Sequence, residues 1–471
     1  MIHVTENIDF VDWKKLVVPF FLFELILLFL IYLDPLFATL FVIGLSGIVL
    51  FYVTFLNGPL IWILLMIFSS GLDVWGQIGG GVTLFHLAWF LAILTSIFYV
   101  LKNPEFTITF DTPITKVGFA YLFYATFSLT YSPNYVDGFR LLGTTFALFL
   151  SFFVFVNFLK TKLHFKLVVF TLAIINMFLS LLTFYQLLFQ NEKYFGTSTV
   201  ATTTGEKVWR ATGTFDDPNV TATFLMVGII LSISVVIFSK EKIKSKLFLI
   251  ISILISFVGI VATFSRSGWL SVAIGIFTLL FFMESKKNIF YALSTILIVI
   301  GIFIVVTPYG EFLVDRLFSV FDIMKDPSIR TRVFMAISSI WMFFDHIIFG
   351  VGFRGYPMYY DFYIHPEAPQ ALLYVKESHT LWTTVLAELG IIGFTIVFIW
   401  FKRIFQDGLS MAKKVTDPFM RSLSIGVFAI FVAFNMDFLF YGFLFPHFNL
   451  FWLVLGIMYA IILNNKTKVQ N

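Results

Sequence analysis

Long runs of apolar residues recur along the whole chain and constrain its fold more than any other feature. A membrane-spanning helix needs about 20 mainly apolar residues. Fourteen segments meet this description, approximately at 16–33, 36–55, 58–73, 83–101, 114–131, 139–159, 166–189, 219–239, 247–264, 268–283, 289–307, 379–401, 422–439 and 448–464. They predict an all-α polytopic membrane protein. We expect about 14 transmembrane helices (12–14). Between the second and third spans, Gly58-Pro59 could be a tight loop or a kink within a re-entrant pair.

The composition agrees with this class. Charged residues make up only 12% of the chain, roughly half the share in soluble domains. The net charge of +4 is spread over short loops, and it therefore points to no nucleic-acid partner. The chain has no cysteine, which excludes disulfides and thiolate nucleophiles. The first apolar run lacks a cleavage site, so we interpret it as an uncleaved span. Without repeats or a soluble domain, residues 1–471 are expected to form one polytopic domain.

The basic residues predict which side of the membrane each loop occupies, since cytoplasmic loops carry an excess of Lys and Arg. With the N-terminus inside and the spans alternating, most of the 31 basic residues lie inside, and nearly all of those are lysine. The outer set is smaller and mostly arginine: Arg140, Lys193, Lys207, Arg210, Arg266, Arg316, Lys325, Arg330, Arg332, Arg354 and Lys376. We therefore expect both termini in the cytoplasm. The outer arginines need a different explanation.

One loop is long, at 308–378, and lies outside in this topology. Within it, 330–350 has an apolar helical face and an opposite, more polar one. The apolar face carries Val333, Phe334, Ile337, Ile340, Trp341 and Phe344, and the other carries Met335, Ser338, Met342 and Asp345. This pattern predicts an amphipathic helix that lies in the membrane interface or caps the bundle. A further span here would expel the basic cluster at 402–421, and we reject it.

Arg266 is the most informative residue of the outer face. Its turn, Ser265-Arg266-Ser267-Gly268, is short and lies between two apolar spans. An arginine so close to hydrocarbon costs a few kcal/mol unless it finds a partner. Snorkelling to lipid phosphate is one explanation. The other is bidentate binding of a substrate phosphate.

A second outer element runs from Arg210 through Gly213-Thr214-Phe215 to Asn219, a candidate N-cap. An arginine beside a helix N-terminus is suited to anion binding, although Glu206 could also pair with Arg210. Arg330 and Arg332 add positive charge from the long loop.

A third element is His379, at the start of a span. Histidine can act as a general base near pH 7, and an interfacial structural histidine is the alternative. Glu388 lies about half a turn around the helix from His379 and ~13.5 Å deeper, so we expect it to pair structurally within the bundle. His365, Glu367, Glu377 and His379 lack the spacing of a known metal site, and we predict no metal.

Together these elements resemble the O-antigen ligase and O-antigen polymerase superfamily of bacterial envelope enzymes, over roughly residues 120–440. The resemblance rests on four motifs in order. They are Arg210–Asn219, Ser265–Gly268, the Phe349–Phe353 segment after Arg330-Thr331-Arg332, and a histidine-initiated span continuing as Glu388-Leu389-Gly390-Ile391-Ile392-Gly393. The family commonly has His-Asn where this chain has His379-Thr380, which affects the expected contacts with the acceptor.

The resemblance implies a metal-independent, inverting glycosyltransferase without a cofactor in the cytoplasmic membrane, acting on its outer face in polysaccharide or lipopolysaccharide synthesis. The donor would be a glycan on undecaprenyl diphosphate, and the acceptor a saccharide or lipid-linked saccharide. Arg210, Arg266, Arg330 and Arg332 would hold the diphosphate, and His379 would deprotonate the acceptor hydroxyl. A flippase and a chain-length regulator are the implied partners. Ligase and polymerase remain equally compatible with the sequence.

Two other functions are compatible with many spans. A transporter or flippase of lipid-linked saccharides would usually place ionisable residues near the bilayer midplane and show internal repeats. Here charges near the midplane are few, with Glu24 and Glu388 as the main cases. A non-catalytic membrane scaffold would leave the arginines and His379 unexplained.

Overall fold

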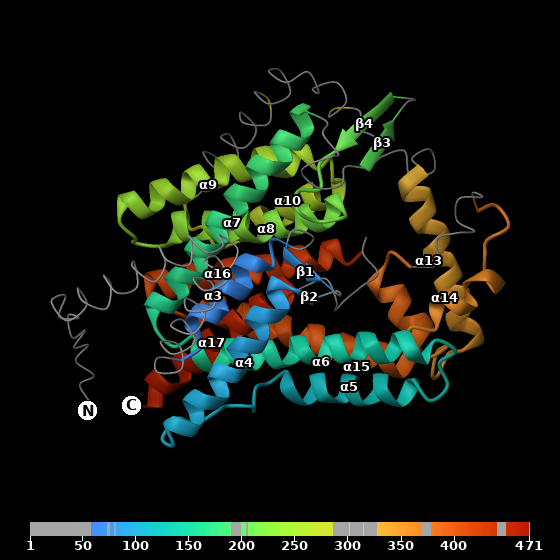
Figure 1. Cartoon of the computed structure of the whole chain (residues 1–471), viewed down its shortest axis with the longest axis horizontal. Coiled ribbons are helices and arrows are strands. Elements are labelled where there is room, and N and C mark those ends of the chain that lie inside the picture. Colours follow the sequence, from blue (N-terminus) through green and yellow to red (C-terminus); the bar gives the residue numbers. More distant parts are fainter. Residues whose placement is uncertain are drawn as a thin grey trace, which may run out of the picture.

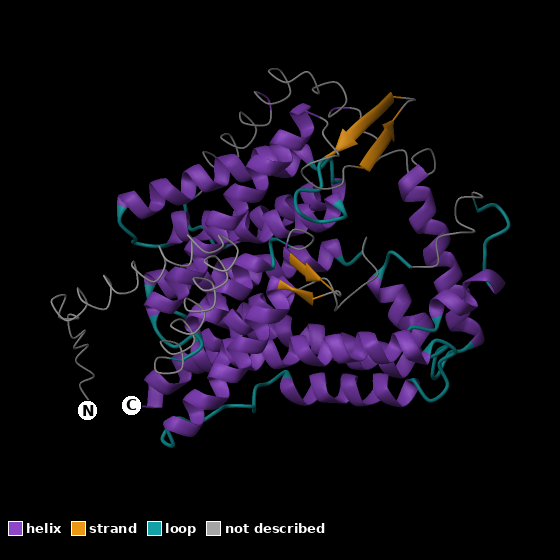
Figure 2. Ribbon diagram, viewed as in Figure 1, coloured by secondary structure: helices purple, strands orange, loops and turns teal. Residues whose placement is uncertain are grey.

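The computed structural model describes residues 58–72, 76–79, 82–189, 199–203, 206–285, 327–368, 378–439 and 449–470, with positions 301 and 314. Helices dominate this part of the chain (Figure 2). Seven of its helices are long and apolar enough to cross a membrane: α4 (Leu84–Lys102), α6 (Tyr135–Phe158), α7 (Lys162–Phe189), α8 (Pro218–Phe238), α9 (Ile243–Ala262), α15 (Leu381–Lys414) and α16 (Pro418–Asp437). The predicted polytopic helical class is confirmed.

Four other helices occupy further predicted spans: α3 (Leu60–Ser69), α5 (Thr115–Ser128), α10 (Arg266–Phe281) and α17 (Asn449–Gln470). The predicted spans at 16–33, 36–55 and 289–307 lie outside the described residues, apart from position 301. A total of fourteen spans therefore stays a prediction.

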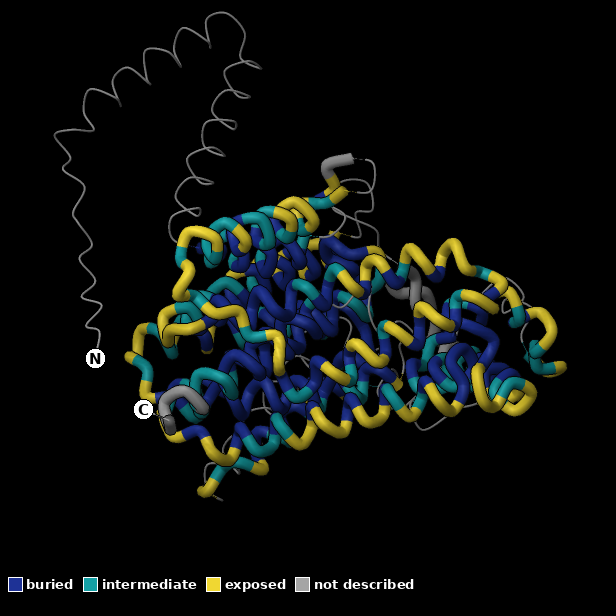
Figure 3. Tube along the Cα trace, turned by 90° about the horizontal axis from the view of Figure 1, so that it is seen from below, coloured by how far each residue is buried: buried dark blue, intermediate teal, exposed yellow. Residues whose placement is uncertain are grey.

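Helices α8 and α16 lie near the centre of the described bundle. The share of buried residues in the apolar window is 78% in α8 and 72% in α16, against 22% in α4 and 33% in α9. Buried segments accordingly fill the middle of the molecule, and exposed ones surround it (Figure 3). Because α8 and α16 are shielded by other helices, polar groups at their ends lie inside the protein rather than against lipid.

The described connections contain two small antiparallel hairpins, which the sequence did not predict. One pairs β1 (Gln77–Gly79) with β2 (Val82–Thr83). The other pairs β3 (Thr199–Thr203) with β4 (Glu206–Arg210). The second hairpin delivers the chain directly to the Arg210 turn.

Lysines gather at one end of the bundle. Lys162 Nζ lies 3.2 Å from Asp417 Oδ2, before α16. Lys166 Nζ lies 2.8 Å from Glu241 Oε2, in the α8–α9 connection. These contacts bring together the connections before α7, α9 and α16, at the left of Figure 1. We call this the lysine end. The β3–β4 hairpin and the α9–α10 turn lie at the opposite end, which we call the arginine end.

The predicted sidedness can be tested because the chain has no native cysteine. Asp361 is exposed at the arginine end and Lys413 is exposed in the last turn of α15. We expect Asp361→Cys to react in intact cells with a membrane-impermeant thiol reagent, and Lys413→Cys to react only after permeabilisation. Equal labelling of both positions in intact cells would contradict the assignment.

The predicted helix of the long loop is present as α13 (Pro327–Asp345). Most of its more polar face is buried, with Met335, Ser338 and Met342 at 0% exposure, whereas Asp345 is exposed. Phe334, on the apolar face, is also buried. Trp341 and Phe344, on the apolar face, are 39% and 63% exposed. The exposed part of the apolar face suits a helix lying in the membrane interface.

Candidate functional site

Two of the predicted outer elements meet at the starts of α8 and α10. Asp217 caps α8, since its Oδ1 accepts from Asn219 N at 2.7 Å. Ser265 caps α10 by accepting from Gly268 N at 3.2 Å. Our prediction that Asn219 is the N-cap was therefore wrong. Pro218 takes the first helical position, which proline favours, so the cap falls one residue before it.

Asn219 instead joins the two turns. Its Oδ1 accepts from Arg210 Nη2 at 3.1 Å and from Ser265 Oγ at 2.8 Å. Arg210 Nε also donates to Thr263 O at 2.9 Å. These bonds hold Arg210 beside the turn that carries Arg266. The arginines therefore come from sequence positions more than 50 residues apart but occupy one region.

The Gly-Thr-Phe part of the first turn is held from within the bundle. Buried Gln186 accepts from Gly213 N at 2.8 Å and donates to Gly213 O at 2.8 Å. Gly213 has a φ of +63°, which glycine adopts without strain. Thr214 Oγ1 donates to Gly71 O at 2.6 Å. The turn is thus a fixed platform for Arg210.

The start of α15 lies at the same end of the bundle. Leu381 N donates to Phe438 O at 3.0 Å, immediately after α16. The preceding residue, Asp437, accepts from Thr223 Oγ1 of α8 at 2.5 Å. The end of α16 therefore connects α8, which carries Asn219, with the first turn of α15. His379 precedes that turn and is half-buried.

Asp437 is a candidate site residue that the sequence analysis missed. It is 2% exposed and interacts electrostatically with Asp217 and Arg332. A carboxylate at the end of an apolar span is costly and usually functional or paired. Its position at the end of an apolar span is the sequence signal that could have identified Asp437. Arg332 of the long loop is therefore close enough to Asp437 for their charges to interact.

Arg330 has different surroundings. Its Nη2 donates to Glu367 O at 3.3 Å, and its guanidinium lies 5.5 Å from the Phe334 ring centroid. His365 stacks on Trp341, with ring centroids 5.3 Å apart. These contacts tie α13 to the loop that follows it. Nothing here places Arg330 beside Arg210.

The helix directions favour an anion at this end. Helices α8, α10 and α15 all begin here, and each N-terminus carries about half a positive charge. Arg210, Arg266 and Arg332 add full charges, which Asp217 and Asp437 offset in part. Within the described ranges, no group of three or more His, Asp or Glu residues could hold a metal ion. Glu377 and His447 lie outside those ranges.

A known protein family matches a segment of the chain that carries part of this site. Residues 250–398 match the family model described as O-antigen ligase. The matched residues make up less than half of the chain. The superfamily resemblance predicted from the sequence is confirmed. The O-antigen ligase match runs from α9 into the first half of α15, and so includes Arg266, Arg330, Arg332 and His379. Arg210 and Asp437 lie outside it.

Other comparisons are weaker. A chain in a solved structure described as "Structural coordination of polymerization and crosslinking by a peptidoglycan synthase complex" is 15% identical, with a TM-score of 0.40. The similarity covers 76% of this chain and 99% of that one. No curated protein matches the chain. The O-antigen ligase family indicates a multi-pass membrane protein with glycosyltransferase-type activity in cell-envelope synthesis.

Proposed function

We propose that the chain transfers or polymerises a glycan from undecaprenyl diphosphate onto an acceptor saccharide hydroxyl, at the outer face of the cytoplasmic membrane. The observation that carries this proposal is the Asn219 bridge between Arg210 and Ser265. It fixes two arginine-bearing turns at the end where α15 begins after His379. Lipid-linked diphosphate is an anion that would occupy this depth at the membrane edge.

The proposed chemistry is metal-independent and inverting. The acceptor oxygen attacks the anomeric carbon, and the bond from that carbon to the diphosphate oxygen breaks. Arg210, Arg266 and Arg332 stabilise the negative charge on the departing polyprenyl diphosphate. His379 takes the proton of the acceptor hydroxyl. Asp437 offsets part of the positive charge of Arg332. Arg330 ties α13, which also carries Arg332, to the segment that follows this helix.

The transporter alternative gains no support from the described spans. Transporters use ionisable groups near the midplane to bind their cargo. Glu388 is the buried carboxylate within α15, and its oxygens accept backbone N–H groups of Arg354 and Tyr356. Both carboxylate oxygens of Glu388 therefore bind the backbone of the chain itself, which is a structural role.

The experiment uses purified protein in nanodiscs, a polyprenyl-diphosphate glycan and an acceptor, with release of polyprenyl diphosphate as the readout. We expect Asn219→Ala to weaken donor binding about tenfold or more, since hydrogen bonds to charged groups contribute roughly 1.5–3 kcal/mol. Asn103→Ala is the matched control, because Asn103 follows the last residue of α4 and its Nδ2 donates to Tyr99 O of that helix at 2.7 Å. Equal donor affinity in both variants would count against the bridge. Absence of any glycan transfer by the unmodified protein would refute the function.

A further inference from the structure

Helix α15 is interrupted nine residues after it begins. Gly390 has φ 62° and ψ −164°, so the helix consists of two parts on either side of it. The first part, 381–389, follows directly on His379. A break inside a span leaves backbone N–H and C=O groups without helical partners, and each costs several kcal/mol in a membrane unless satisfied.

The segment after α13 supplies those partners. Val351 N donates to Ala387 O and Gly352 N donates to Glu388 O, each at 2.9 Å. Beyond the break, Ile391 N donates to Ile347 O at 2.8 Å. The chain around Gly350 therefore docks into the gap in α15.

Two glycines permit this close approach. A Cβ on Gly350 would lie 2.4 Å from the backbone carbonyl of Glu388, and one on Gly390 would lie 2.4 Å from Ile348 O. Both glycines also have positive φ. The Phe349–Phe353 motif and the Glu388-Leu389-Gly390 motif are thus two halves of one backbone junction.

The Glu388 side chain completes the junction. Its Oε2 accepts from Arg354 N at 3.0 Å and its Oε1 accepts from Tyr356 N at 3.3 Å. The side chain is 7% exposed. A buried carboxylate that accepts two backbone N–H groups fixes both partners, because a buried charge without such bonds is strongly unfavourable.

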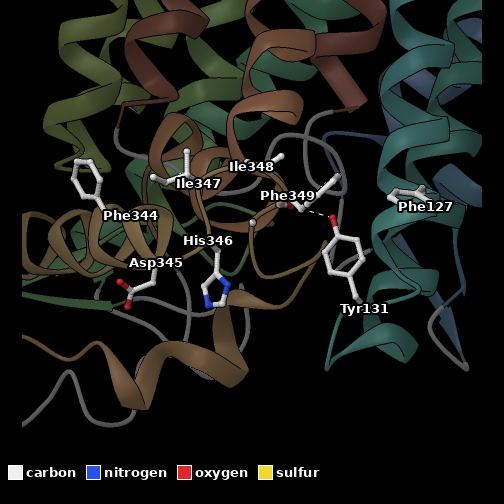
Figure 4. Close-up of a pocket in the computed structure, with 9 residues that line it drawn as sticks. Phe127, Tyr131, Phe344, Asp345, His346, Ile347, Ile348 and Phe349 are labelled. Atoms are coloured by element: carbon white, nitrogen blue, oxygen red, sulfur yellow. Dashed lines mark hydrogen bonds between the residues drawn. The ribbon is translucent and has the colours of Figure 1, made fainter.

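The docked segment is itself anchored to α5 and its exit. Phe353 N donates to Ser128 Oγ at 3.1 Å, and Tyr131 OH donates to Phe349 O at 2.9 Å. Figure 4 shows the second bond at the edge of a pocket of about 820 Å³ lined by 344–350, Phe127 and Tyr131. The junction therefore connects the first part of α15 to a firmly held wall of the bundle.

The other end of this helix part is held by α13. Ser339 Oγ donates to Ser378 Oγ at 3.3 Å, one residue before His379. Leu381 N donates a hydrogen bond to Phe438 O. The segment 378–389 is therefore fixed at both ends. At the end near Gly390, backbone hydrogen bonds and the Glu388 side chain both hold it.

We propose that Glu388 is a positioning residue for glycan transfer: by binding the 354–356 backbone it fixes the first part of α15 and so the location of His379. This rests on the proposed function, in which His379 is the base. Glu388 does not touch the reacting groups. A shift of about 1 Å at a catalytic group can cost up to ~10²-fold in rate.

The first test measures kcat and donor affinity separately. We expect Glu388→Ala to lower kcat roughly 10–100-fold and to change the donor Kd less than about threefold. Glu388→Gln should fall between Ala and the unmodified protein, because one carbonyl oxygen remains to accept one N–H group. Glutamine also preserves the volume of the side chain. The Glu388→Gln variant therefore tests the proposal if Glu388→Ala does not fold.

The matched control is Asp407→Ala. Asp407 lies in the second part of α15 and binds Arg403 Nε at 3.1 Å and Tyr459 OH at 2.8 Å. We expect it to lower thermal stability without lowering kcat. Equal kcat in the Glu388 and Asp407 variants would overturn the proposal, as would a loss of donor binding in proportion to kcat in the Glu388 variant.

The second test does not depend on activity. Cysteines at Ser339 and Ser378 should form a disulfide under mild oxidation, because their Oγ atoms lie 3.3 Å apart and the chain has no other cysteine. We expect Glu388→Ala to slow this cross-link about tenfold or more, and Asp407→Ala to leave it unchanged. An unchanged rate in the Glu388→Ala background would refute the positioning role. If positioning holds and the unmodified protein transfers no glycan, the proposed function alone fails.

Discussion

Replacing Arg266 or Arg210 by alanine is expected to reduce glycan transfer below detection while the protein still inserts and folds. The reason is the loss of a planar donor for the diphosphate. Lysine should restore little activity at either position, because a point charge cannot replace the bidentate guanidinium. The measurement is donor binding and transfer by purified variants in nanodiscs, with membrane yield and thermal stability recorded for each.

The matched control is Arg140→Ala. Arg140 belongs to the outer set, near the start of α6, with a side chain 77% exposed and 3.4 Å from Asp137. It should retain near-normal donor binding. If Arg210→Lys and Arg266→Lys both transfer glycan at close to the normal rate, these arginines only orient toward lipid phosphate, and the diphosphate role fails.

Replacing His379 by alanine is expected to lower the rate of transfer by roughly 10²–10⁴, the usual contribution of a general base. Donor binding should persist, because Arg210, Arg266 and Arg332 remain. His346→Ala should have little effect on transfer. His346 packs edge-on against Tyr359 at 5.6 Å and lines the pocket in Figure 4. His365 and His447 should also tolerate alanine. A variant at His379 that no longer binds donor would assign this histidine to the phosphate site.

The sequence predicted the helical class and the grouping of charges at the ends of the bundle. Apolar length and the contrast between lysine and arginine loops are strong signals, because burying backbone and charge in a membrane has few solutions. Residues such as Lys166 and Arg210 therefore lie at opposite ends, as the alternation of spans requires. Which end faces the cytoplasm stays a prediction.

Other features depend on contacts that the sequence does not reveal. Span 379–401 was predicted as continuous, and a lone glycine does not distinguish a break from ordinary packing. The interruption at Gly390 exists because 347–352 supplies its hydrogen bonds. The hairpin at 199–210 is short and lies in a loop, where alternation gives little signal. For α8, by contrast, Pro218 carried enough information to place the cap at Asp217.

The most direct test of the account compares three proteins under single-turnover conditions: the unmodified chain, Arg266→Ala and His379→Ala. Donor binding and release of polyprenyl diphosphate are measured on the same nanodisc preparation, with acceptor present. We predict that the unmodified chain binds and releases, that His379→Ala binds without releasing, and that Arg266→Ala does not bind. Release by His379→Ala at the normal rate, or normal binding by Arg266→Ala, would contradict the account.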